Sequence, residues 1–281
     1  MITAEKILQR IDEFRTLPTV YTALTEAMNN PNSSAADVAA VISSDQAAAA
    51  RVLKAANSPI YGYSGRIDSV NKAIMYMGFA EVKNLVAALA ILDVFSNVRI
   101  SAYFNPVEFW KYSAAVGVIA RALAREAGRK GLEHCFLGGI LHDLGKLLLY
   151  QCAPEEFSQA LQTVALRKIT LRSALKETVG ISHNALGELL AEQWKMPPPI
   201  RAVIRYAHTG MNDDKPDELV AAVHIASISA QMFGFGSSSE EIVPEPNEIA
   251  WKTLSLPDNI FTKLQEQIIQ DYEGTLDSLQ L

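Results

Sequence analysis

A histidine, an aspartate and a lysine interrupt the apolar stretch FLGGILHDLGKLLLY at residues 136–150. Polar groups in such surroundings cost free energy unless a partner or an ion compensates them. On a helix, His142 and Lys146 would lie one turn apart on one face, with Asp143 rotated by about 100°. The imidazole and the carboxylate could then bind one Mn, Fe, Ni or Zn ion, and Lys146 could contact a phosphate oxygen. A hydrogen-bonded structural pair is the alternative.

Three of the chain's other histidines lie downstream on expected helices: His183, His208 and His224. Side chains from several helices can converge in the core of a bundle, where carboxylate-bridged metal sites are built. Each of these histidines, taken singly, is equally explained as a hydrogen-bonded residue of the core or of a helix end. The remaining one, His134 in GLEHC, is assigned no role.

Apolar residues recur at helical spacing almost throughout the chain, and no alternating strand pattern is evident, so we predict an all-α fold. We expect an N-terminal helical lobe at 1–104, a helical bundle at 105–236, and a loop with a C-terminal helix packed on the body at 237–281. The helices expected in the bundle span 110–127, 135–150, 154–166, 171–179, 184–195, 199–208 and 219–233. The segment 234–251 has a loop-like composition.

Helix-terminal residues punctuate the first lobe. Ser34 with Asp37 predicts a capping box, Ser44 or Asp45 is expected to cap the next helix, and Asp68 or Ser69 the one after. Gly78 is expected to end that helix. In the second lobe the glycines of GGILHDLG would let another backbone approach closely: Gly138, Gly139 and Gly145.

Bulk composition limits the possible classes of function. The 281 residues are 49% hydrophobic and 20% charged, as in a globular chain, and the formal charge of −6 disfavours a general nucleic-acid binder. The basic cluster of Arg121, Arg125, Arg129 and Lys130 is interpreted as a solvated helix face. Cys135 and Cys152 are expected to be inert core thiols. The amphipathic N-terminus and the short apolar runs favour a cytoplasmic protein without a membrane span.

Several motifs, in order and at family-like spacing, now support a resemblance. They are LPTV (17–20), the SSD turn, RVLKAANSPIYG, IDSVNKAIMYMG, FWKYS, GGILHDLGKL, ETVGISHNALGELLAEQWKMP and IRYAHTG. The chain resembles bacterial HDOD proteins, signalling relatives of the HD-domain metal-dependent phosphohydrolases, from Leu17 to about Phe235. The resemblance implies two helical lobes, the second an HD-type bundle. Asn57 and Ser58 belong to its hallmark motif, and we expect them to cap backbone groups at a helix end.

The same resemblance implies which residues would form the site. Active HD hydrolases carry a histidine where this chain has Tyr112, and an aspartate where it has Ser227. The HD pair is kept, His183 matches a further histidine of extended HD phosphodiesterases, and His208 matches the second of a His-His pair. A phenol, whose pKa is ordinarily about 10, binds divalent metal poorly near neutral pH, and serine binds it more weakly still.

Three functions remain open. The first is a non-catalytic signalling module that binds a regulatory protein or a phosphorylated small molecule, needs no cofactor, and holds at most a weak ion at His142, Asp143, His183 and His208. The second is a metal-dependent phosphohydrolase or cyclic-dinucleotide phosphodiesterase, in which Asp143 and Lys146 would have catalytic roles. The third is a DNA-binding regulator that uses residues 34–56 as a helix-turn-helix. We rank them in that order.

Overall fold

The computed structural model describes residues 7, 9–10, 19–30, 32–63, 65–96, 100–101, 103–128, 132–240 and 242–281. Every regular element in these ranges is a helix, apart from one isolated bridge between Asn212 and Lys215, which confirms the all-α prediction. No helix in the same ranges is both long enough and apolar enough to cross a membrane. Leu17 and Pro18 of the LPTV motif, and Arg129 and Lys130 of the basic cluster, lie outside the described residues.

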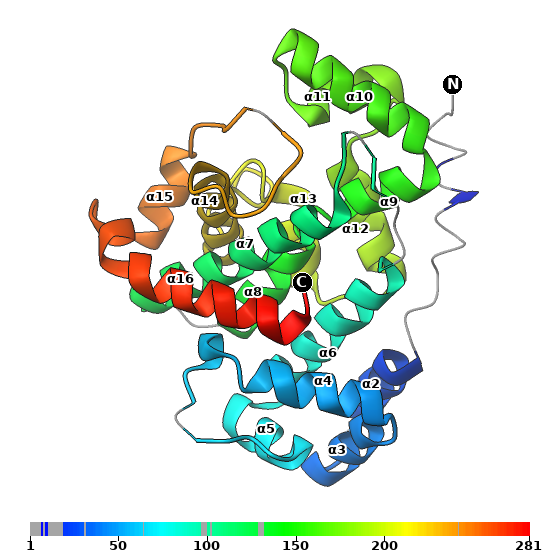
Figure 1. Ribbon diagram of the computed structural model, residues 1–281, viewed down its shortest axis with the longest axis vertical. Helices are drawn as coiled ribbons and strands as arrows, with labels where there is room; N and C mark the ends of the chain where they lie inside the picture. The colour runs from blue at the N-terminus through cyan, green and yellow to red at the C-terminus, as the bar shows by residue number, and fades with distance from the viewer. Residues whose placement is uncertain are drawn as a thin grey trace. The chain divides into compact units, whose positions relative to one another are not determined.

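The chain divides into two compact units, and Figure 1 labels their helices. The smaller unit contains helices α2 to α6 and the part of α16 from Lys263 onward. Its elements are α2 (Thr19–Asn29), α3 (Ala35–Ser43), α4 (Gln46–Ala56), the 3₁₀ turn η2 (Pro59–Tyr61), α5 (Val70–Met77) and α6 (Phe79–Val94). Helices α2, α4 and α5 all pack against α6, which supplies the apolar centre of this unit.

The predicted helix ends of the smaller unit are confirmed. Ser34 and Asp37 form the reciprocal capping box of α3. Of the alternatives, Asp45 caps α4 by accepting from two backbone N–H groups, and Ser69 caps α5. Gly78 ends α5 with a φ of +83°, a conformation that favours glycine.

The two hallmark residues behave differently. Asn57 donates from Nδ2 to the carbonyls of Leu53 and Ile67, both at 2.7 Å, and its Oδ1 accepts from the Ile67 N–H at 2.9 Å. It therefore ties the end of α4 to the loop that precedes α5. Ser58 is buried but forms no side-chain cap at η2, so the capping expected of Ser58 is wrong.

The larger unit carries the candidate site and runs from α7 to the start of α16. Its elements are α7 (Pro106–Glu126), η3 (Leu132–His134), α8 (Cys135–Leu141), α9 (Leu144–Cys152), α10 (Pro154–Arg167), α11 (Leu171–Thr178), α12 (His183–Gln193), α13 (Pro198–Tyr206), α14 (Glu218–Met232), α15 (Glu248–Leu254) and the part of α16 (Ile260–Leu279) that precedes Lys263. Helix α7 packs against α8 and α14, and α12 packs against α9 and α13. Both cysteines are buried thiols that form no disulfide with each other.

Two expectations about secondary structure are wrong. The stretch 135–150 is two helices, because the chain turns at His142 and Asp143, where Asp143 has a φ of −112° and a ψ of 22°. This turn aims the carboxylate into the bundle from the start of α9. The loop-like segment 234–251 contains the start of α15, because Asn247 caps a new helix at Glu248.

Glycines set the close helix contacts around that turn. A Cβ on Gly139 would overlap the backbone of Gly117 in α7, and a Cβ on Gly145 would overlap the carbonyl oxygen of His183 at the start of α12. The expectation of close approach is therefore confirmed at Gly139 and Gly145. At Gly138 a Cβ would meet only side-chain atoms, the nearest at 3.5 Å, which is ordinary contact.

Candidate HD site

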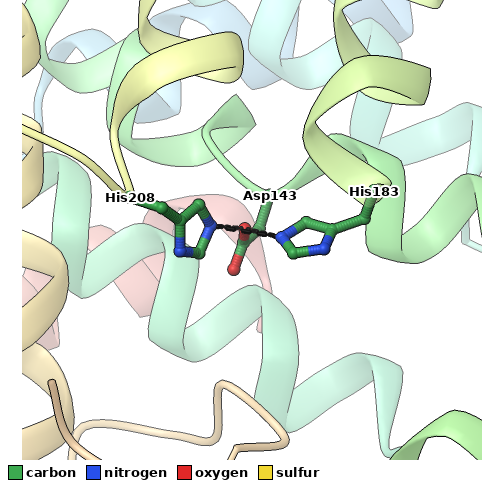
Figure 2. Close-up of side chains that lie close together, drawn as sticks. All are labelled: Asp143, His183 and His208. Atoms are coloured by element: carbon green, nitrogen blue, oxygen red, sulfur yellow. Dashed lines mark hydrogen bonds and ion pairs between the residues drawn. The ribbon is translucent and has the colours of Figure 1, made fainter. Parts of the chain in front are cut away.

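Three side chains from separate parts of the larger unit converge on one point. Asp143 comes from the turn before α9, His183 opens α12, and His208 follows α13. His208 Nε2 lies 2.7 Å from Asp143 Oδ1, His183 Nε2 lies 3.4 Å from the same oxygen, and the two Nε2 atoms are 3.2 Å apart. Figure 2 shows the carboxylate between the two imidazoles. We call Asp143, His183 and His208 the triad.

The triad has a donor set suited to a divalent metal. Two ligand atoms held about 2.1 Å from one ion, at angles between about 90° and 110°, lie roughly 3.0 to 3.4 Å apart. Two of the three separations in the triad, 3.2 and 3.4 Å, lie in that range, and the third, 2.7 Å, is shorter. Two imidazoles with one carboxylate suit Mn, Fe, Ni or Zn. These residues could therefore hold an ion with three protein ligands.

The histidine beside the aspartate is not part of this convergence. His142 Nδ1 lies 2.7 Å from the Gly139 carbonyl, which only accepts, so Nδ1 carries the proton and Nε2 presents its lone pair. That Nε2 faces Tyr112 Oη at 3.3 Å and Asp143 Oδ2 at 3.4 Å, on the other carboxylate oxygen. Burial lowers the pKa of His142, so the ring is neutral.

In the part of the chain that the structure describes, the second ring nitrogen of His183 lacks the hydrogen bond that usually fixes a metal-ligating histidine. Metal-ligating histidines usually donate their second nitrogen to a carbonyl or carboxylate, which fixes the ring. His142 has such a partner but lies outside the triad, whereas His183 Nδ1 is buried with no hydrogen-bond partner among the described residues. Burial also lowers the pKa of His183 to about 4. Its ring is thus available as a neutral ligand but is not held by a second contact.

Lys146 places a cation directly on the aspartate. Its side chain is almost completely buried, and Nζ forms an ion pair with Asp143 Oδ2 at 2.8 Å. The same ammonium donates to Glu240 Oε1 at 2.7 Å and to the Ser238 carbonyl at 3.1 Å. The ammonium therefore contacts three oxygen atoms, two of them through hydrogen bonds and the third, Asp143 Oδ2, through the ion pair.

The electrostatics of the site follow from this arrangement. Burial alone would raise the pKa of Asp143, but the ammonium of Lys146, with His142 and His208, lowers it well below the usual range. Burial likewise opposes the charge on Lys146, and the carboxylates of Asp143 and Glu240 outweigh it and raise the lysine pKa. Asp143 and Lys146 are therefore both charged at neutral pH, inside the protein.

Tyr112 and Ser227 are the two positions at which the resemblance implies lost metal ligands; Tyr112 adjoins the HD pair, and Ser227 adjoins Tyr112. The Tyr112 hydroxyl lies 3.3 Å from His142 Nε2 and 3.4 Å from the Ser227 carbonyl oxygen. Burial, and next the charge of Asp143, raise the pKa of Tyr112, so the phenol stays protonated. Ser227 Oγ donates to the His224 carbonyl at 2.9 Å. Neither side chain offers a free anionic ligand.

His224, which the sequence grouped with the other downstream histidines, lies outside the triad. Its Nδ1 donates to the Ala207 carbonyl at 2.7 Å, and its Nε2 accepts from the Asn247 backbone N–H at 2.9 Å. Both ring nitrogens are thus used, and together they join the residue after α13 to the residue before α15. His224 is therefore the hydrogen-bonded core residue that was the alternative to a metal ligand.

Two contributors to the site, Ser238 and Glu240, were not identified from the sequence. They lie 92 and 94 residues beyond Lys146, in the connection between α14 and α15. No spacing or motif in the chain links them to the HD pair. The only available signal was that a lysine in so apolar a stretch needs more acceptors than one neighbouring carboxylate can offer.

A helical bundle with a His-Asp pair in a turn at its centre is typical of HD-type domains. The chain belongs to the HDOD domain family, whose model matches residues 14–210. It is 26% identical over 243 residues to an uncharacterized protein of Treponema pallidum (strain Nichols), covering 85% of this chain but only 46% of that protein's length.

Two solved structures resemble the fold. An HDOD domain protein of unknown function from Geobacter sulfurreducens is 25% identical, with a TM-score of 0.75 and 98% of both chains covered. A candidate phosphohydrolase from Shewanella amazonensis SB2B is 24% identical, with a TM-score of 0.68, and the match covers 97% of this chain and 98% of that one. The second likeness concerns the fold alone.

Proposed function

We propose that this chain is a non-catalytic HDOD regulatory module whose HD site binds a phosphorylated small molecule without cleaving it. The buried ion pair between Lys146 and Asp143 carries this proposal. One oxygen of the carboxylate on which a catalytic ion would depend is already neutralised by an ammonium. His142 and His183 are neutral, so Lys146 is the cation of this cluster that an anionic ligand would bind.

The remaining donors support binding over hydrolysis. Metal-assisted cleavage of a phosphoester requires a firmly held ion with an open coordination position. Tyr112 stays protonated, Ser227 donates elsewhere, and His183 has no supporting contact on its second nitrogen. We therefore expect an ion in the triad to be held loosely.

A metal-dependent phosphohydrolase is the second candidate, and the spacing of the triad favours it. Asp143, His183 and His208 would hold the ion, which would supply Lewis-acid polarisation of a phosphoryl oxygen. Lys146 would then neutralise charge on the phosphate. The two imidazoles converge on Asp143 Oδ1 whereas Lys146 pairs with Oδ2, so an ion in the triad and the ammonium would share one carboxylate.

Metal content and turnover distinguish the two candidates. Protein purified without nickel resin is analysed for metals and assayed with Mn²⁺ on bis(p-nitrophenyl) phosphate and a cyclic dinucleotide, beside Asp143→Ala. We expect substoichiometric metal and no turnover above that of the variant. Brisk turnover that Asp143→Ala abolishes would refute the non-catalytic proposal.

A restoring variant tests the reason given for weak metal binding. Tyr112→His combined with Ser227→Asp supplies an imidazole beside His142 and a carboxylate at the residue whose carbonyl contacts Tyr112. We expect the double variant to retain Mn²⁺ or Zn²⁺ through gel filtration while the unaltered chain loses it. Equal retention would mean that these two positions do not limit the metal site.

A further inference from the structure

The connection between α14 and α15 reaches back into the HD site. We call residues 234–240 of this connection the strap; it belongs to the orange segment in Figure 1. The strap lies beyond the residues that the family model matches, which end at residue 210. It supplies the two oxygen atoms to which Lys146 donates hydrogen bonds, the Ser238 carbonyl and the Glu240 carboxylate.

The strap is seated by specific backbone contacts. The Ser237 N–H donates to the Glu108 carbonyl in α7 at 3.0 Å. Gly236, with a φ of +64°, lies so close to α7 that a Cβ there would overlap the Glu108 oxygen and the Tyr112 nitrogen. The Glu240 N–H donates to Ser238 Oγ at 3.2 Å, which fixes the turn that presents the carboxylate.

The Glu240 carboxylate is bound as an external anion would be. Oε1 accepts from the Lys146 ammonium at 2.7 Å, and Oε2 accepts from the Leu171 N–H, the first residue of α11, at 3.1 Å. A cationic side chain and a helix-terminal N–H are both groups that bind phosphate oxygens. Burial opposes the charge on Glu240, and Lys146 nevertheless lowers the glutamate pKa below its usual value.

The closed arrangement disfavours a phosphate in two ways. Glu240 occupies both donors, and one ammonium against two carboxylates leaves the cluster net negative. Removing Glu240 would free the Lys146 ammonium and the Leu171 N–H together, and would leave Asp143 as the sole opposing charge. The Lys146 side chain is only 1% exposed, whereas that of Glu240 is 14% exposed, so the strap side of the ion pair is the one at the solvent edge.

We propose that Lys146 and the Leu171 N–H form an anion site for a phosphorylated ligand, and that Glu240 of the strap fills this site until the ligand displaces it. The inference rests on the proposed function, because it assumes that the HD site takes a phosphorylated molecule. It makes the strap an internal competitor. The affinity of a site is reduced by the fraction of molecules in the competent state, so a strap closed in about nine molecules of ten weakens binding roughly tenfold.

Titration calorimetry with inorganic pyrophosphate, on the full chain in metal-free buffer, tests the proposal. We expect Glu240→Ala to bind pyrophosphate at least tenfold more tightly than the unaltered chain. Glu245→Ala, which removes the same charge from an exposed position in the same connection, should bind like the unaltered chain. Equal affinity of the unaltered chain and of Glu240→Ala for pyrophosphate would overturn the proposed competition by the strap but leave the proposed function standing. Binding by neither would overturn both.

A second measurement needs no variant, and so remains informative if Glu240→Ala folds poorly. Hydrogen exchange of the strap amides is followed in the unaltered chain with and without saturating pyrophosphate. We expect the Ser237 amide, which is bonded to Glu108, to exchange at least tenfold faster once the ligand displaces the strap. Unchanged protection of that amide with pyrophosphate bound would contradict displacement.

Discussion

Replacing Lys146 with methionine removes a charge from the centre of the larger unit while keeping a stem of similar length. The side chain is almost completely buried and neutralises two carboxylates, Asp143 at 2.8 Å and Glu240 at 2.7 Å. Removing one partner of a buried ion pair costs about 3–5 kcal/mol, because the other charge stays buried and unpaired. Two carboxylates are stranded here, so we expect about 5 kcal/mol, or a Tm lower by roughly 10–20 °C.

Differential scanning calorimetry of the variant measures this loss, with Lys252→Met as the matched control. Lys252 pairs with Glu248 at 3.0 Å, but both side chains are at least 75% exposed, so its loss should leave the Tm unchanged. A chelator should not lower the Tm of the unaltered chain, because Lys146 already neutralises Asp143. Divalent metal should stabilise Lys146→Met more than it stabilises the unaltered chain, since an ion can then replace the missing charge.

The deficit of Lys146→Met should shrink on acidification. In the unaltered chain the pKa values of Asp143 and Glu240 are lowered, so their contribution to stability exists above the unfolded pKa and is lost as pH falls through the folded one. Without the ammonium, burial raises both pKa values, and protonation then relieves the stranded charges as pH falls from 7. A Tm loss no larger than that of Lys252→Met, or one independent of pH, would refute this account of the site.

Three further outcomes are expected. Gly145→Ala should lower the unfolding free energy by more than about 3 kcal/mol, because the added methyl group would collide with the His183 carbonyl. Gly138→Ala should be tolerated, and similar urea midpoints for the two variants would contradict the packing described. Asn57→Ala should cost about 1–3 kcal/mol in chemical denaturation because it strands the backbone groups of the loop before α5, while Ser58→Ala should cost far less. The His183 ring should titrate near pH 4 by NMR. Because its folded pKa lies below the unfolded one, the free energy of unfolding should fall as pH drops from about 6.5 toward 4. A titration at the ordinary value, near 6.5, would show that the ring is not buried.

Local signals in the sequence predicted the helical elements well. Apolar spacing indicated the helices of both units, and side chains that accept backbone N–H groups marked where several begin, as at Ser34, Asp45 and Ser69. These features are predictable because the interacting groups lie within four residues of each other. The start of α15 at Glu248 was missed, since glycines, serines and prolines before it mask a short helix.

The geometry of the site was less accessible. Spacing on a continuous helix predicted His142 and Asp143 on adjacent faces, but the turn between α8 and α9 directs their side chains to different neighbours. On either side of this turn, Gly139 packs closely on α7 and Gly145 on α12. These contacts join segments that lie far apart in the chain. Hydrophobic periodicity reports which face of a helix is buried and carries no information on where tertiary packing interrupts it.

An HD pair in a sequence is therefore incomplete evidence for a metal enzyme, because a buried aspartate requires a cation and does not specify which one. In this chain Lys146 provides that charge from one turn further along, and its remaining protons require acceptors that only a distant segment supplies. The lysine thus joins the HD turn, the strap and the start of α11 through a single ammonium group. Any ligand that competes for Lys146 must also change the contacts of the strap. Binding at the HD site and the conformation of the segment after α14 are consequently expected to be linked, which is the physical requirement for a regulatory module.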